Sequence, residues 1–129
     1  MKLKQLSVFL ENSPGHLQRI CSVLSKANIN LQTITISESK SYGLMRAIVD
    51  KPEEAVAALE KEGIMSKLID VLSVEVPDRP GALLEILNRA QEASLNIEYM
   101  YAWTKGERGN PIMIMKFNDV EQAAKILDS

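Results

Sequence analysis

The sequence has little of what most catalytic, metal-binding and cross-linked proteins require. Its 129 residues include one cysteine, Cys21, and one histidine, His16. A single cysteine forms no internal disulfide, and the two residues give neither a zinc-ligand spacing nor a Cys-x-x-Cys pair. A triad needs a base beside a nucleophile, and the chain has one imidazole, no Walker loop and no G-x-G-x-x-G. We therefore expect no catalytic residue, no metal and no cofactor.

Charge of one sign and long apolar runs are also sparse. The formal net charge is −2, with 15 basic and 17 acidic residues mixed along the chain. Without a basic run, neither nucleic acid nor an anionic membrane is an expected partner. No segment approaches the roughly 20 apolar residues of a spanning helix, and no run of signal-peptide length follows the first residues. The expected location is the cytoplasm.

What the sequence does contain is typical of a folded protein. Hydrophobic residues make up 46% of the chain and charged residues 25%, close to an average soluble globular protein. The length suits one ordinary domain or two small ones that share a core.

The first half of the chain alternates between strand and helix patterns. Residues 2–10 alternate apolar and polar side chains, which predicts a half-buried strand. From His16 onward, apolar residues recur at i, i+3, i+4 and i+7, which predicts a helix whose buried stripe includes Cys21 as a core thiol. Asp50-x-x-Glu53 resembles a capping box before a second helix. The remaining segments are strands at 29–37, 44–49 and 64–69, and the second helix at 55–62.

This pattern repeats with an offset of 66 residues, from Pro14 to Pro80. The offset becomes 68 after the hairpin, so that Met45 matches Met113, and the two extra residues fall around 105–111. A repeat that preserves turn, helix pattern and cap together predicts two modules, residues 1–70 and 71–129. Each is an α+β unit of the order strand, helix, strand, strand, helix, strand.

The repeat also sorts the strand faces. One set of side chains is expected to face the helices: Ile34, Ile36, Met45, Ala47, Val49, Met100, Ala102, Met113, Met115 and Phe117. Tyr99, Tyr101 and Trp103 then share the opposite, open face with Arg46 and Lys116. Such an aromatic stripe predicts a contact, either with the partner module or a second chain, or with a ligand.

The turn before each first helix, Asn12-Ser13-Pro14-Gly15 and Asp78-Arg79-Pro80-Gly81, carries the binding hypothesis. Proline suits the first helical position, and the free N–H groups that follow it favour a ligand carboxylate. The side chains of Asn12, Asn30, Asp78 and Asn96 offer acceptors for a ligand ammonium group.

Plainer interpretations stay open for each of these residues. Asn12 and Asp78 are also residues that satisfy the backbone of a turn. Asn30 and Asn96 are also residues that end a helix in a left-handed conformation. His16 is either a ligand contact or an ordinary exposed residue at a helix start.

The doubled Pro-Gly turn, with an asparagine sixteen residues after the proline in both copies, resembles the ACT domain family over essentially the whole chain. The resemblance implies two ferredoxin-like βαββαβ modules in tandem, with antiparallel sheets, helices on one face, and the modules packed side by side. It also implies that an amino acid or related metabolite binds at the module interface. The family's ligand-binding positions fall on Asn12, Pro14, Gly15, His16, Leu17, Asn30 and Leu31, and on Asp78, Pro80, Gly81, Ala82, Leu83, Asn96 and Ile97.

The second copy departs from this pattern because it stops at the end of its last helix, without a fourth strand. The strand around 72–76 would then lack its expected neighbour, and an unpaired edge invites association. Another chain, or the strand at 64–69, would cover that edge, or it would stay exposed.

The sequence therefore predicts a regulatory or sensor protein that is not an enzyme. Its expected partners are an amino acid or related small metabolite, further copies of itself in a homodimer or higher oligomer, and a regulated enzyme or transporter. The alternatives are a ligand-free interaction module and, less favoured, a small enzyme in which Arg46 or Arg79 polarises an anion.

Overall fold

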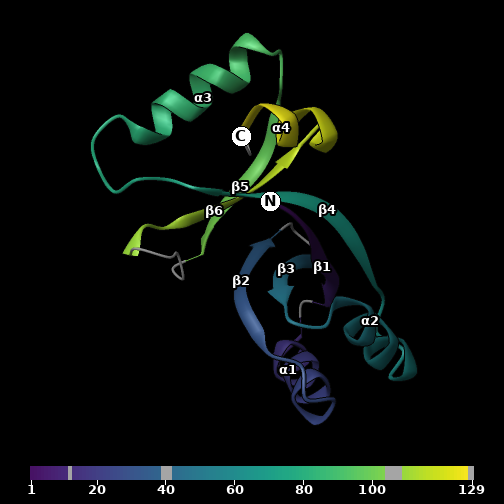
Figure 1. Cartoon of the computed structure of the whole chain (residues 1–129). Coiled ribbons are helices and arrows are strands. Elements are labelled where there is room, and N and C mark those ends of the chain that lie inside the picture. The colour runs from purple at the N-terminus through teal and green to yellow at the C-terminus, as the bar shows by residue number, and fades with distance from the viewer. Residues whose placement is uncertain (12, 39–41, 104–108, 128–129) are drawn as a thin grey trace. The chain divides into compact units, whose positions relative to one another are not determined.

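A computed structural model describes residues 1–11, 13–38, 42–103 and 109–127 (Figure 1). The described chain is an α+β fold with four helices and six strands. None of its described helices combines the length and apolar character needed to cross a membrane. The elements follow in the order β1 (Lys2–Glu11), α1 (His16–Lys26), β2 (Leu31–Glu38), β3 (Tyr42–Val49), α2 (Pro52–Lys61), β4 (Ser66–Glu75), α3 (Ala82–Glu92), β5 (Ile97–Trp103), β6 (Ile112–Phe117) and α4 (Val120–Leu127).

The strands hydrogen-bond in the order β2-β3-β1-β4-β6-β5. β3 pairs antiparallel with β1 and β2, and β6 pairs antiparallel with β4 and β5. The chain divides into two compact units, one of Lys4–Ile69 and the other of Asp70–Ser129 together with Met1–Leu3. The strand order within Lys4–Ile69 is therefore β2-β3-β1-β4. This is the order of a βαββαβ unit in which α1 connects β1 to β2 and α2 connects β3 to β4.

β4 has a neighbour that the sequence did not suggest. The N–H of Ser73, on β4, donates to the carbonyl of Met1 at 2.9 Å, and the amino group of Met1 donates to the carbonyl of Ser73 at 2.9 Å. The strand that was expected to lack a neighbour is therefore paired at Ser73, where Met1 lies beside it. Among the described residues, which end at Leu127, no strand follows α4.

The core of Lys4–Ile69 lies between its strands and its two helices. Strand residues such as Leu6 and Met45 are fully buried together with Ile20 of α1 and Leu59 of α2. The predicted helix-facing positions of β3 are confirmed, and burial of these apolar side chains is the main stabilising term. The buried cluster comprises Leu6, Val8, Ile20, Leu24, Ile29, Met45, Ala47, Val49, Ala55, Leu59 and Ile64.

The second unit repeats this arrangement with different side chains. Met115 and Phe117 of β6 are fully buried, as predicted, and Met100 and Met113 pack against their cluster. Ile86 of α3 and Ala123 of α4 close the core from the helical side. The cluster comprises Leu72, Val74, Val76, Ala82, Ile86, Ala90, Leu95, Met115, Phe117, Ala123 and Leu127.

Two predicted core positions of β2 remain exposed. Ile34 and Ile36 pair with Ala47 and Met45 and so share the helix-facing side of the sheet. Their side chains are nevertheless 41% and 40% exposed. β2 is an edge strand with a strand neighbour on one side only, so fewer side chains are available to cover Ile34 and Ile36.

Candidate functional site

The first Pro-Gly stretch forms a type II turn that precedes α1. Gly15 has φ +86° and ψ −5°, and the N–H of His16 donates to the carbonyl of Ser13 at 3.4 Å. A positive φ at the third position, with proline at the second, defines this turn type. α1 begins at His16 with Gly15 as its N-cap. Pro14 therefore lies in the turn, and its predicted role as a first helical residue is wrong.

The second copy reproduces the turn closely. Gly81 has φ +84° and ψ −7° and caps α3, which begins at Ala82. The N–H of Ala82 donates to the carbonyl of Arg79 at 3.3 Å, so Pro80 also occupies the turn. An added Cβ on Gly81 would meet no atom within 4 Å, which means that the backbone conformation, and not crowding, requires glycine here.

Each turn leaves two backbone N–H groups without an acceptor inside the helix. The first intrahelical bonds run from the N–H of Arg19 to Gly15 at 2.9 Å and from the N–H of Glu85 to Gly81 at 3.0 Å. Neither N-cap residue supplies a side-chain cap. The N–H groups of the second and third helical residues therefore point outward at the positive end of each helix. They belong to Leu17 and Gln18 in α1, and to Leu83 and Leu84 in α3.

His16 holds the first turn against the end of β1. Its Nδ1 accepts a hydrogen bond from the N–H of Glu11 at 2.8 Å. An acceptor at Nδ1 assigns the proton of the neutral imidazole to Nε2. His16 is half-buried, so it is more than an ordinary exposed residue at a helix start. Asn12, the other predicted ligand residue in this turn, lies outside the described residues.

In the second turn, an asparagine from the β5–β6 connection holds the turn in place. Asn110 accepts from the N–H of Asp78 through Oδ1 at 3.3 Å and donates from Nδ2 to Oε1 of Glu75 at 3.1 Å. Asp78 itself is exposed, so its side chain is accessible to a ligand. Sequence reasoning missed Asn110, although the two-residue insertion around 105–111 marked this connection as the place where the copies differ.

Arg79 and Glu85 form an ion pair across the second turn. Nη1 and Nη2 of Arg79 donate to Oε1 and Oε2 of Glu85 at 3.2 and 2.9 Å. The hydrogen bond and the charge of Arg79 lower the pKa of Glu85, and the carboxylate raises the pKa of Arg79 in return. The first copy has Ser13 and Arg19 at these positions, so the two turns differ in charge.

The asparagines at the head of the second strand are held through their backbone. The N–H of Asn30 donates to Oδ1 of Asp50 at 2.9 Å, and the N–H of Asp50 donates back to the carbonyl of Asn30 at 3.2 Å. The same pair of bonds joins Asn96 and Asn118 at 2.9 and 3.1 Å. These ties place the entry of β2 beside the end of β3, and the entry of β5 beside the end of β6.

Two sequence interpretations change as a result. Asp50 does not cap α2, whose N-cap is Lys51 without a side-chain cap bond. The left-handed residues after the helices are Asn28 at φ 60° and Ser94 at φ 57°. Asn30 and Asn96 therefore do not end their helices in a left-handed conformation.

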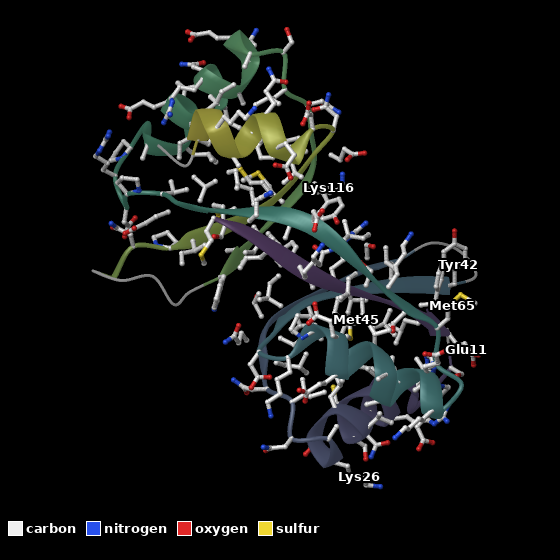
Figure 2. All side chains as sticks on the ribbon, turned by 45° about the vertical axis from the view of Figure 1, so that its right-hand side comes forward. Glu11, Lys26, Tyr42, Met45, Met65 and Lys116 are labelled. Carbon is white, nitrogen blue, oxygen red and sulfur yellow. The ribbon has the colours of Figure 1, made fainter. Side chains whose placement is uncertain are left out.

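The predicted site residues of each unit fall into two groups at opposite ends of a helix. Pro14 and Leu17 lie at the start of α1, whereas Asn30 and Leu31 follow its end. α1 has eleven residues, which corresponds to about 16 Å. In Figure 2, Glu11, at the end of β1, lies apart from Lys26, in the last turn of α1. Ala82, Leu83, Asn96 and Ile97 are divided in the same way by α3.

An open concavity of about 440 Å³ lies at the second group in the first unit. Asp50 and Asn30 line it beside Cys21, which is half-buried rather than a core thiol. Its lining residues are Cys21, Leu24, Ser25, Asn28, Ile29, Asn30, Leu31 and Asp50. This wall mixes amide, hydroxyl and carboxylate groups with apolar surface.

The aromatic stripe of β5 lies on the side of the sheet opposite Met115, as predicted, but that face is not open, since Ile114 on it is fully buried. Tyr99 and Tyr101 pair with Lys116 and Ile114, away from the buried Met115. All three aromatic residues are half-buried. The Nε1–H of Trp103 is buried without an acceptor among the residues that the structure describes.

Comparison with known proteins places these turns in a family context. The pattern of the ACT domain pair family matches residues 1–128. A solved structure of a Bacteroides thetaiotaomicron protein is 33% identical, with a TM-score of 0.91 over 99% of this chain and 88% of the other. The regulatory subunit of aspartate kinase from Thermus thermophilus, at 20% identity and a TM-score of 0.65, covers 97% of this chain and 88% of its own, and shares the fold.

Curated relatives match over part of their length. The acetolactate synthase small subunit of Buchnera aphidicola (from Schizaphis graminum) is 35% identical over 71 residues, which are 54% of this chain and 44% of that protein. The small subunit of acetolactate synthase isozyme 3 from Escherichia coli is 32% identical over 71 residues, covering 54% and 42%. The chain thus spans less than half of either relative.

Proposed function

The chain belongs to the ACT domain pair family, and on that premise we propose that it is a regulatory protein that binds an amino acid at its Pro-Gly turns. The observation that carries the proposal is the repeated type II turn, which leaves two outward N–H groups at the start of both α1 and α3. Backbone N–H groups at the positive end of a helix bind carboxylates. We interpret each unit as a ferredoxin-like module, and their side-by-side packing stays a prediction.

Each turn has its own pair of outward N–H groups for a carboxylate, but the side chains around that pair differ between the two turns. At the second turn, the exposed carboxylate of Asp78 is an acceptor for a ligand ammonium group, and the Arg79–Glu85 pair adds no net charge. At the first turn, the Nε2–H of His16 is a further donor to an anion. The second turn therefore suits a zwitterion better, because it offers partners for both of its charges.

A complete site draws on two modules in this proposal. The helix-start group and the Asn30 group of one unit lie about 16 Å apart, farther than one amino acid reaches. In this proposal, the Asn30 group of one module, with the concavity beside Asn30 and Asp50, forms one half of a site. The Pro-Gly turn of a different module forms the other half. Asp50 and Asn118 are positioning residues, since they hold the backbone of Asn30 and Asn96.

The regulated partner is proposed from the relatives. Two of them are named small subunits of acetolactate synthase and another is named a regulatory subunit of aspartate kinase. We accordingly expect this chain to act in the cytoplasm on a separate catalytic subunit, with the amino acid shifting the population of an assembled state. A role in catalysis itself is not part of the proposal.

A thermal-shift panel of the twenty amino acids tests binding. A ligand that binds only the folded state stabilises it by about 2.7 kcal/mol at one hundred times its Kd, so the melting temperature is expected to rise by several degrees. Asp78→Ala should remove this shift, whereas Glu60→Ala, an exposed acid on α2, should keep it. If no amino acid moves the melting temperature at millimolar concentration, the proposal is wrong.

The exposed Ile34 and Ile36 of β2 favour a second function, that of an interaction module without a ligand. Two apolar side chains at about 40% exposure on an edge strand are a means of strand-to-strand association. Ile34→Lys would then change the oligomeric mass while leaving any amino acid shift at the turns intact.

A further inference from the structure

A groove between α1 and α2 lies away from the proposed amino acid site. It has a volume of about 390 Å³ and a floor of small apolar side chains, Val23, Ala27 and Ala58. A floor of this kind accommodates one apolar side chain from another helix, because small residues let a knob approach the helix backbones.

The rim of this groove is positively charged. Arg19, Lys26 and Lys61 line it together with one acid, Glu62. Glu62 is paired with Arg19. The guanidinium of Arg19 donates to the backbone carbonyl of Glu62 at 2.8 Å and lies 3.8 Å from the Glu62 carboxylate. No carboxylate of the described residues lies within ion-pair distance of Lys26 or Lys61. The groove therefore has a net positive rim that favours an acidic partner.

The same chain presents a helix with the opposite charges at the same spacing. In the repeat, Arg19 and Lys26 of α1 correspond to Glu85 and Glu92 of α3. Both pairs are seven residues apart, which is two helical turns or about 10.5 Å along one stripe. Each charge on one stripe thus has an opposite charge at a matching distance on the other.

An apolar knob adjoins the acidic stripe. Leu84 is 60% exposed on α3, at the position where the first copy has Gln18. A single exposed leucine is ordinary, but Leu84 directly precedes Glu85, the first acid of the acidic stripe on α3. The basic residue between the two acids, Arg89, is turned toward α4, where it donates to the carbonyl of Ile126.

We propose that α3 of one copy docks in the α1–α2 groove of a second copy. In this parallel register Glu92 meets Lys26, and Leu84, next to Glu85, lies at the Arg19 end of the groove. Glu85 reaches Arg19 by exchanging its exposed partner Arg79, since both ends of that pair are more than half exposed. The contact joins two different surfaces, so it is heterologous, and each added copy keeps one groove and one α3 available.

Sedimentation velocity of the full chain between 1 and 200 μM tests this contact, those concentrations being about the range for weak to moderate association. Mass is expected to rise with concentration at low salt and to fall at high salt, because the Debye length shrinks from about 10 Å at 0.1 M to about 3 Å at 1 M. Lys26→Glu and Glu92→Lys should each weaken association by about tenfold, since each turns an attraction into a repulsion. Leu84→Gln should weaken it without a change in charge.

Mixing the two charge variants gives the decisive result. Each associates poorly with itself, but an equimolar mixture of Lys26→Glu and Glu92→Lys should recover the wild-type mass, because every contact between unlike copies again joins opposite charges. Lys67→Glu, an exposed lysine of β4 outside the groove, makes the same charge change and should behave as wild type. Melting curves check that all variants fold.

Three outcomes overturn the inference. They are a monomer at every concentration, an association indifferent to Lys26→Glu and Glu92→Lys, and a mixture that recovers nothing. An association that responds only to Ile34→Lys assigns self-assembly to the edge of β2 instead. Self-association is measured as mass and amino acid binding as a shift in melting temperature, so the two proposals fail separately.

Discussion

Replacing Gly81 by alanine isolates the backbone conformation on which the second turn depends. Gly81 has φ +84°, and an added Cβ would meet nothing within 4 Å. Steric crowding therefore contributes nothing, and the cost is that of holding an L-residue in the left-handed region, about 1–2 kcal/mol. Alanine also stiffens the unfolded chain, an effect worth about 0.4–1 kcal/mol where the native φ suits it. The net loss should be about 1 kcal/mol.

Urea unfolding at 25 °C measures this loss as a shift in midpoint at unchanged slope. Gly15→Ala provides an internal replicate, because its φ is +86° and its surroundings are equally open. Gly81→Asn should cost less than Gly81→Ala, since asparagine tolerates left-handed angles. A neutral or stabilising Gly81→Ala would refute the type II turn, and with it the outward N–H groups.

Three further predictions concern the hydrogen bonds around the turns. Asp50→Ala removes the acceptor that holds the N–H of Asn30 and should cost about 1–2 kcal/mol in urea unfolding, with Asp50→Asn largely restoring it. His16→Ala removes the acceptor at the end of β1 and should cost about 0.5–1.5 kcal/mol. Because Arg79 lowers the pKa of Glu85, the stability from this pair is present above the unfolded pKa of about 4.3 and is lost as pH falls through the folded value. Arg79→Gln should flatten that decline.

Each of these has a result that contradicts it. An Asp50→Ala variant as stable as Asp50→Asn would mean that the carboxylate does not hold β2. A fully stable His16→Ala would return His16 to the class of ordinary surface residues. A steeper acid decline in Arg79→Gln than in the wild type would reverse the sign argued for Glu85.

The repeated elements could be predicted because they rest on local signals. Apolar periodicity located the helices after Gly15 and Gly81, and the helix-facing side chains of β3 and β6 followed from strand alternation. The turn type could not be settled in the same way. Proline followed by glycine fits both a helix that starts at proline and a type II turn, and these differ only in the φ of the glycine.

The predictions were wrong where hydrogen bonds to residues distant in the sequence determine the local structure. Asp50 has the local spacing of a capping residue, but the N–H of Asn30 competes for its carboxylate across the sheet. Met1 pairs with Ser73 on β4, 72 positions away. The apolar periodicity of the sequence does not predict this contact. Asn110 holds the second turn from within a connection that looked only like an insertion. Long-range hydrogen bonds such as these leave no mark in a single sequence.

Amide chemical shifts test the central claim most directly. In a ¹⁵N–¹H spectrum, the amino acid that raises the melting temperature should shift the amides of Leu83 and Leu84, and those of Leu17 and Gln18 where the first turn also binds. The matching amino alcohol, which lacks the carboxylate, should leave these four amides in place. Shifts confined to other residues, or equal shifts with the amino alcohol, would contradict a carboxylate bound at the helix starts.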